Sequence, residues 1–170
     1  MAGKSDGDIV LMSIQPRYVE LILLRQKRVE FRKVRFRRSV SHILVYASRP
    51  VMRIVGVAEI RYMEEGNPED LWRRYSTVGG ISREAFFSYY SSTSYGVAIG
   101  IGEVHRFPVP LRLSDLDSDL RAPQSYIYLD HRTSQDVLRR ALKSSHSASD
   151  RQPLRQKNIL DSPAFEAETA

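Results

Sequence analysis

The sequence contains no cysteine, which excludes a disulfide framework, a thiolate metal site and a cysteine nucleophile. The four histidines lie far apart and lack the spacing typical of metal ligands: His42, His105, His131 and His146. No apolar run approaches the roughly 20 residues that a membrane-spanning helix needs. The polar N-terminus also lacks the apolar core of a secretion signal. We therefore expect a cytoplasmic protein that does not enter a membrane and holds no resident metal or cofactor.

The length of the chain bounds its domain organisation. Its 170 residues suffice for one ordinary domain with a core and are too few for two of typical size. An apolar fraction of 42% and a charged fraction of 27% are globular values. We expect a flexible leader over residues 1–8, one domain over 9–142 and a disordered tail over 143–170. The tail is expected because that segment has few apolar residues to bury.

The positive charge of the chain is concentrated in one segment. The whole chain has a net charge of +6, whereas residues 25–38 hold eight lysines and arginines against one acid, Glu30, a local net charge of +7. Apolar and charged residues alternate there, and Val34 and Phe36 continue the alternation after a shift of one residue. This period predicts a strand over Lys27–Arg38 with one buried face. Such a basic patch attracts phosphate backbones, although cations also protect exposed strand edges.

The remaining pattern predicts an α+β fold. A tight turn at Pro50 favours an antiparallel hairpin, and Gly56 is expected to mark a bulge in its second strand. Gly100 and Gly102 leave one face of a later strand almost bare, where a helix or a ligand must pack closely. The strands are expected near residues 9–14, 27–38, 43–48, 52–62, 95–104 and 126–129, with helices after Pro16, Asn67, Ser82 and Ser134. We expect a small mixed β-barrel of five or six strands flanked by two to four helices.

Several blocks occur in a characteristic order along the chain. They are Ser13-Ile14-Gln15-Pro16, Lys27-x-x-Glu30-x-Arg32, Val45–Ser48 with Pro50, Val55-Gly56, Gly80-Ile81-Ser82 and Pro123–Leu129. In this order they resemble the signature of the ASCH domains, which belong to the PUA-like superfamily of small β-barrels. The resemblance spans about residues 9–130. It has two departures, because Arg25 stands where the family has a glycine and Gln15 where it has a lysine.

The resemblance implies a cleft between the sheet and the first helix, lined by Lys27, Glu30 and Arg32. PUA-like relatives bind RNA, some ASCH proteins hydrolyse N4-acetylcytidine, and a ribonuclease activity is ascribed to others. In the amidohydrolases a threonine nucleophile occupies the position that matches Glu30. This chain lacks that hydroxyl, so the resemblance gives the amidohydrolase activity less support here.

The residue types of this cleft indicate their roles. A carboxylate among cations stays ionised, so Glu30 is expected to accept a hydrogen bond, for example from the amino edge of cytosine. Arg28 and Arg32 would hold phosphate or stack on a base. If the protein is an enzyme, Lys27 and Glu30 are the expected catalytic pair. The alternative is that Glu30 and Arg32 form a structural ion pair with the first helix.

These observations favour an RNA-binding module, with RNA preferred over DNA and no cofactor. An enzyme acting on nucleosides or RNA is the first alternative. A transcriptional regulator comes last, because no helix-turn-helix is recognisable. The residues expected to contact nucleic acid are Gln15, Arg17, Lys27, Arg28, Glu30, Arg32, Lys33, Arg35, Ser48, Arg49, Gln124, Ser125 and Tyr126.

Overall fold

The structure is a computed structural model and describes residues 7–148. The described chain forms six strands, four α-helices and one short 3-10 helix, η1. In chain order they are β1 (Asp8–Ile14), α1 (Pro16–Leu23), β2 (Val29–Arg32), β3 (Val40–Ala47), β4 (Arg53–Gly66), α2 (Pro68–Tyr75), α3 (Arg83–Tyr89), β5 (Gly96–Leu111), η1 (Leu113–Asp115), β6 (Tyr126–Tyr128) and α4 (His131–Ala148).

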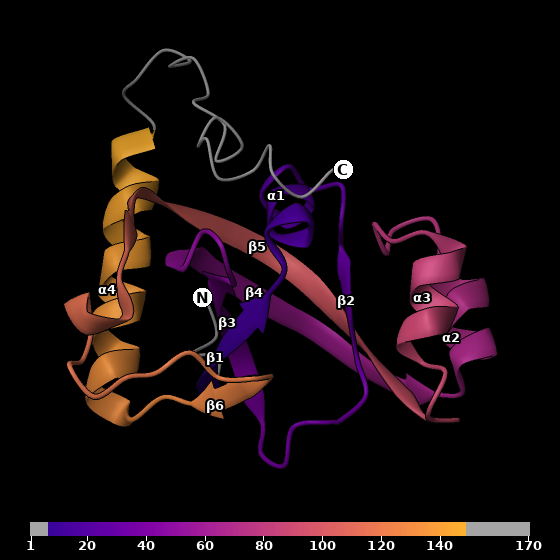
Figure 1. Ribbon diagram of the computed structural model, residues 1–170. Helices are drawn as coiled ribbons and strands as arrows, with labels where there is room; N and C mark the ends of the chain where they lie inside the picture. The colour runs from indigo at the N-terminus through magenta and orange to yellow at the C-terminus, as the bar shows by residue number, and fades with distance from the viewer. Residues whose placement is uncertain (1–6, 149–170) are drawn as a thin grey trace.

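All six described strands join one curled sheet in the order β2-β5-β4-β3-β1-β6 (Figure 1). Only the β1–β3 pair is parallel among these strands, and the other neighbours are antiparallel. The predicted hairpin around Pro50 is present as β3 and β4, and shifts in register beside Gly56 confirm the predicted bulge. The predicted α+β fold is confirmed.

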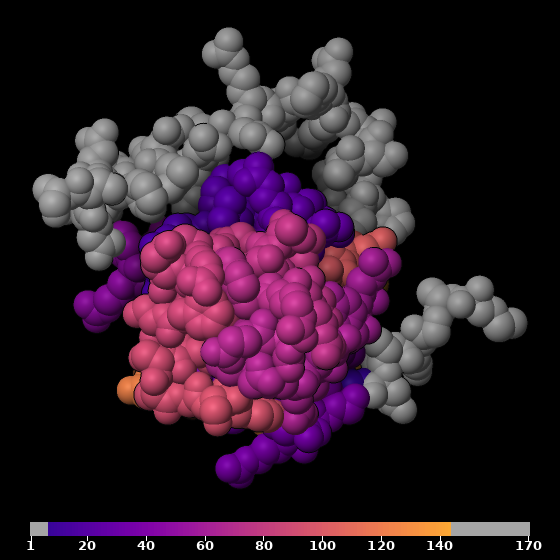
Figure 2. Space-filling model, turned by 90° about the vertical axis from the view of Figure 1, so that its right-hand side faces the viewer, coloured from indigo at the N-terminus to yellow at the C-terminus, as the bar shows by residue number. Residues whose placement is uncertain are grey.

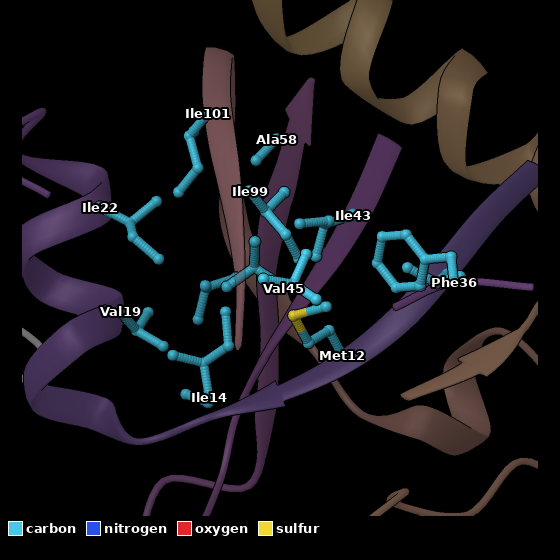
Figure 3. Close-up of a cluster of buried hydrophobic side chains, with 14 residues drawn as sticks. Met12, Ile14, Val19, Ile22, Phe36, Ile43, Val45, Ala58, Ile99 and Ile101 are labelled. Atoms are coloured by element: carbon cyan, nitrogen blue, oxygen red, sulfur yellow. The ribbon is translucent and has the colours of Figure 1, made fainter. Parts of the chain in front are cut away.

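One face of the sheet packs against α1 and against the segment that follows β2. Val19 and Ile22 of α1 point toward Ile99 and Ile101 of β5, and Phe36 closes the far end of this cluster (Figure 3). The apolar residues of α1 recur at i, i+3 and i+4, so the helix buries one side and leaves the other in water. The predicted helix after Pro16 is therefore confirmed, and its buried side fixes α1 over the sheet.

The opposite face of the sheet has two separate covers. Val137 and Ala141 of α4 pack on Leu11 and Leu44 at one end. At the other end α2 and α3 bury a second cluster that includes Val29, Phe31, Leu71, Phe86 and Ala98. Figure 2 looks onto these two helices, which make up most of that side of the molecule. The strand β2 is thus held from behind by α2 and α3.

Arg25 occupies the turn where the family pattern has glycine. Its φ is 62°, in the left-handed region that glycine adopts without strain. The Arg25 guanidinium donates a hydrogen bond to the carbonyl of Gly102 on β5. The turn thus keeps the glycine-type backbone, and the arginine side chain gains a contact with the sheet that glycine would not make.

The predicted basic strand is shorter than expected. β2 ends at Arg32, and residues 33–39 form a loop instead of continuing the strand. The one-residue shift before Val34 would point the later apolar side chains to the other face of a strand paired with β5, so the pairing ends. Phe36 is instead buried in the core cluster on the α1 side of the sheet. Val34 consequently remains 61% exposed. The prediction of a strand over Lys27–Arg38 is wrong beyond Arg32.

The glycine-rich face of β5 is filled by aromatic side chains. A Cβ atom on Gly100 would lie 2.3 Å from the Tyr62 ring, and one on Gly96 would lie 2.8 Å from the Tyr90 ring. A Cβ atom on Gly102 would lie 2.5 Å from the Glu59 carboxylate. The atoms nearest to Gly100 and Gly102 thus belong to side chains of the neighbouring strand β4, rather than to the helix that was one of the two predicted explanations.

The expected ends of the domain differ in part from the structure. β1 starts at Asp8, and α4 continues to Ala148, past the expected boundary at Leu142. The apolar positions Val137 and Ala141 dock α4 on the sheet, and the helix extends beyond them. The expected division of the chain into leader, domain and tail stays a prediction. The rest of the expected tail, residues 149–170, and the leader residues 1–6 lie outside the described range.

Candidate nucleic-acid interface

The carboxyl ends of the parallel strands β1 and β3 bring two of the predicted blocks together. Ile14 lies opposite Ala47, and the amide of Ser48 donates to the carbonyl of Ile14 over 2.9 Å. Gln15 follows as the N-cap residue of α1, and its exposed side chain makes no capping hydrogen bond. Gln15 and Ser48 therefore stand side by side at one end of the sheet.

Ser13 connects the same end to the segment before β6. Its amide donates to the carbonyl of Ser125 over 3.0 Å, and its hydroxyl donates to the carbonyl of Pro123 over 2.6 Å. Gln124 and Ser125 are exposed beside this contact. The first and last predicted blocks, 110 residues apart between Ser13 and Pro123, thus meet at one place.

Arg32 joins the two opposite edges of the sheet. It is the last residue of β2 at one edge, and its Nη2 donates to the carbonyl of Ser13 on β1 over 2.7 Å. Its Nη1 lies 3.5 Å from the hydroxyl of Ser125, just before β6 at the other edge. The carbonyl of Arg32 accepts a hydrogen bond from the Tyr90 hydroxyl over 2.9 Å. A side chain therefore closes the gap between the edges of the curled sheet.

Glu30 lies between two cations in the interior of this site. One carboxylate oxygen is 3.4 Å from Nζ of Lys27, and the other is 3.2 Å from Nε of Arg32. The Nε–H of Arg32 has no aligned hydrogen-bond acceptor among the described residues, so its pairing with Glu30 is ionic. The Glu30 side chain keeps 8% of its surface exposed and that of Arg32 12%. The carboxylate is thus held rigidly and can be reached only at its edge.

Lys27 lies deeper than Glu30. Only 2% of its surface is exposed, and its Nζ donates to the carbonyl of Gly79 over 2.6 Å. A Cβ atom on the neighbouring Gly80 would lie 2.8 Å from the Lys27 Cβ, and Gly80 has a φ of 58°. The Gly79-Gly80 turn therefore lets the backbone approach the lysine closely. The pKa of Lys27 is lowered by its burial, an effect that Glu30 opposes.

Aromatic rings border the buried ammonium. Nζ of Lys27 lies 5.2 Å from the ring centroid of Tyr18 on α1 and 5.3 Å from that of Phe31. The guanidinium of Arg17, which is exposed, lies 4.6 Å from the same Tyr18 ring. Tyr18 consequently separates a buried cation from an exposed one.

The expected ion pair between Glu30 and Arg32 is present, and Lys27 is a second partner of the carboxylate. The first helix, α1, contacts Lys27 through the ring of Tyr18 and the carbonyl of Leu21, which accepts a hydrogen bond from the Lys27 amide. Lys27 is shielded, so it acts on any ligand through Glu30. Chemically, the group that the site offers to a ligand is a fixed carboxylate acceptor with arginine donors at its rim.

The cations beyond β2 surround the site at its surface. Lys33 donates to the Ser92 hydroxyl over 3.3 Å and lies over the Tyr89 ring. Arg35 pairs with Glu65 over 3.0 Å, with more than half of its side chain exposed. Tyr126 supports this loop, because its hydroxyl donates to the Arg35 carbonyl over 3.2 Å. Tyr126 thus holds the loop, and its expected contact with nucleic acid stays a prediction.

The remaining predicted residues stand at the periphery. Arg28 is exposed, while its backbone pairs with Val78 and Ile101. Arg49 is exposed in the turn after β3. The structure thus brings Lys27, Glu30, Arg32 and Ser125 into one connected cluster, with the other predicted residues around it.

Sequence reasoning did not assign Gly79 and Tyr90 to this site. Gly79 contributes through its backbone carbonyl and Tyr90 through its hydroxyl, and no sequence pattern specifies either contact. The adjacent pair Gly79-Gly80 was a usable signal, since two glycines mark a close approach of the backbone.

Within residues 7–148, no group of three or more histidine, aspartate or glutamate side chains is arranged to hold a metal ion. None of the helices in that range is long and apolar enough to cross a membrane.

Comparisons with known proteins agree with this geometry. No family model matches the chain. A curated protein of Zymomonas mobilis, named ASCH domain-containing ribonuclease, is 25% identical over 141 residues, which are 81% of this chain and 95% of that protein. The crystal structure of ASCH from Zymomonas mobilis superposes with a TM-score of 0.72 at 24% identity, covering 78% of this chain and 94% of that one.

A more distant likeness concerns the fold alone. The N-terminal domain of Staphylothermus marinus McrB matches with a TM-score of 0.52 at 10% identity, over 78% of this chain. The curled six-stranded sheet with its helices is an α+β fold that this chain shares with the Zymomonas mobilis ASCH structure. The sequence match over 81% of this chain supports the resemblance to the ASCH domains that the ordered blocks predict.

Proposed function

We propose that this protein binds single-stranded RNA and recognises one nucleotide at the carboxylate of Glu30. The observation that carries the proposal is the position of that carboxylate, fixed between Lys27 and Arg32 with its edge exposed where the two sheet edges meet. A fixed acceptor suits the exocyclic amine of cytosine or adenine, which donates a hydrogen bond. The name of the Zymomonas mobilis relative also supports RNA as the ligand.

Exposed cations around the cleft would hold the RNA backbone. Arg17, Arg49 and the loop of residues 33–38 surround the cluster and offer charge without base specificity. Single-stranded RNA is preferred over duplex in this proposal, because only an unpaired base can present its amino edge to a recessed carboxylate.

The test compares cytidine and uridine oligonucleotides by fluorescence anisotropy over a range of salt concentrations. Cytosine has an amine where uracil has a carbonyl, so wild-type protein should bind the cytidine oligomer about tenfold more tightly. Affinity for both should fall as salt increases. Equal affinities for the two bases would disprove base recognition by Glu30.

Replacing Glu30 distinguishes base recognition from general electrostatic attraction, because the two predict opposite changes in affinity. Glu30→Gln makes the cleft more positive, so a purely electrostatic patch would bind RNA more tightly. Base recognition by the carboxylate predicts weaker cytidine binding instead, because the amide presents donors as well as an acceptor. Glu65→Gln is the matched control, since Glu65 also pairs with an arginine but lies on the surface.

Cleavage of RNA is the second candidate function. It is favoured by one observation, the match over 81% of this chain with a relative named as a ribonuclease. In this chain the Glu30 carboxylate would accept the proton of the 2′-hydroxyl as its oxygen bonds to phosphorus, and Arg32 would stabilise the charge that develops on the phosphate. The bond from phosphorus to the 5′-oxygen then breaks, and the protonated Glu30 would return the proton to that leaving oxygen. Cleavage that is lost in Glu30→Gln and retained in Glu65→Gln would support it. Equal rates in both variants would assign the activity to another source.

A further inference from the structure

We infer that a second nucleotide of the bound strand occupies a cavity behind the end of β2, between the start of α2 and the loop that follows α3. This inference rests on the proposed RNA binding and extends it beyond the Glu30 cleft. The cavity has a volume of about 530 Å³ and is lined on one side by Phe87 and Tyr90. This volume is within the range of small-ligand sites.

The other side of the cavity carries hydroxyl groups. Ser91, Ser92 and Ser94 line it from consecutive turns of the loop after α3. In the part of the chain that the structure describes, the hydroxyls of Ser91 and Ser94 hydrogen-bond to no protein group. A hydroxyl without a protein partner can donate or accept a hydrogen bond, so these serines suit a ribose, whose hydroxyls do the same.

Two cations stand at the borders of this cavity. Lys33 donates to the Ser92 hydroxyl over 3.3 Å, and its Nζ lies 4.9 Å from the centroid of the Tyr89 ring. The Arg83 guanidinium lies 4.9 Å from the centroid of Phe87, one of the lining rings. The partly exposed ring of Phe87, the free hydroxyls and the ammonium of Lys33 are the contacts that a base, a ribose and a phosphate need respectively, whereas the Tyr90 ring is buried and serves as the wall of the cavity.

Glu69 also lines the cavity and opposes a phosphate placed beside it. The phosphate is therefore assigned to the Lys33 border, and Glu69 is left to accept a hydrogen bond from the base or the ribose. The ligand class that fits this charge arrangement is a nucleoside monophosphate unit. A bare polyanion would meet the Glu69 carboxylate without compensation.

Tyr90 connects the cavity with the Glu30 cleft. Its ring lines the cavity, and its hydroxyl donates to the carbonyl of Arg32 over 2.9 Å. The two sites thus lie on either side of the end of β2, and Lys33 is the next residue after that end. An RNA strand with one nucleotide at Glu30 would contact Lys33 on its way to the second site.

The experiment has two parts that separate this inference from the proposed function. First, cytidine monophosphate is titrated into the isotopically labelled full-length protein, and the backbone amide signals are followed. The inference expects saturable shifts at residues 91–94. Absence of those shifts at saturating concentration, with oligonucleotide binding intact, overturns the inference and leaves the proposed function standing. Shifts at residues 91–94 without any oligonucleotide binding would overturn the proposed function and leave a nucleotide site in this cavity.

The second part uses oligonucleotides from the dinucleotide to the octanucleotide. Ser92→Ala should weaken binding of the longer oligomers about fivefold, the effect of one lost hydrogen bond. Ser88→Ala, on the exposed side of α3, is the matched control. Lys33→Met should lower the salt dependence by about one counterion, against no change for Lys143→Met on α4. Equal effects in target and control variants overturn the inference.

Discussion

The two halves of the basic segment differ in everything except composition. From Lys27 to Arg32, three of the four charged side chains are largely buried and have defined partners: Lys27, Glu30 and Arg32. From Lys33 to Arg38 the cations stand in a loop, where Arg35 and Arg38 pair with surface acids and Lys33 lies over a tyrosine ring. The difference teaches that burial, rather than the number of cations, decides whether a charge has a fixed place.

Energetics follow from the same contrast. Breaking a buried ion pair by removing one partner costs about 3–5 kcal/mol, because the remaining charge is left without compensation. Removing one partner of an exposed pair costs about 0–1 kcal/mol. The first half of the segment should therefore control folding stability, and the second half should control attraction of an anionic ligand.

The largest expected effect tests the buried half. Glu30→Gln leaves Lys27 and Arg32 as two buried cations without an anion, and the free energy of unfolding should fall by about 3–5 kcal/mol. Urea denaturation measures this change. The surface counterpart Glu65→Gln should lose less than about 1 kcal/mol. Similar losses for the two variants would remove the distinction between the halves.

A smaller effect is expected when the bridge between the sheet edges is shortened. Arg32→Lys keeps the positive charge and loses the planar group that reaches Ser13 and Ser125 together, so unfolding should become easier by about 2 kcal/mol. Thermal unfolding measures it, with Arg35→Lys as the control in the loop. A loss in the control as large as in Arg32→Lys would contradict a special role for the bridge.

The exposed half is tested by binding instead of stability. Arg35→Gln and Arg37→Gln together should lower RNA affinity by about tenfold at low salt and reduce the salt dependence by about two counterions. The free energy of unfolding should change by less than about 1 kcal/mol. Anisotropy and urea titrations on the same samples check both expectations. A loss of stability without a change in RNA affinity would contradict this expectation and would mean that these arginines act like the buried residues of the first half.

The smallest effect concerns pH. The folded-state pKa of Lys27 is lowered by burial, so between that pKa and the ordinary lysine value of 10.5 the unfolded chain binds more protons than the folded one. Stability from this group therefore rises with pH across that alkaline window. Unfolding measured at increasing pH should show a rise that Lys27→Met lacks and Lys33→Met keeps. A parallel pH dependence in all three proteins would contradict it.

Much of the fold follows from local patterns. The apolar positions of α1, the hairpin at Pro50 and the bulge at Gly56 were all predictable, because each depends on neighbouring residues. The early end of β2 was not predictable, because the burial of Phe36 in the core depends on contacts that form only when the whole sheet is assembled.

The candidate site was predictable in its residues and less so in its geometry. Alternation placed Glu30 and Arg32 on one side of a strand, and both take part in the cluster. That Lys27 would be buried against Gly79, or that Arg32 would reach Ser13, depends on the curl of the sheet. Long-range closure of this kind leaves no local pattern in a sequence.

The way in which the sheet closes has a consequence for its dynamics. Across the seam between β2 and β6, the contacts come from side chains: Arg32, and the hydroxyls of Tyr126 and Tyr128 that bind the backbone of the loop. Such a seam can part without breaking a rung of the strand ladders, so its local opening costs less than global unfolding. We expect such an opening to expose more of the recessed Glu30 carboxylate than the closed seam does.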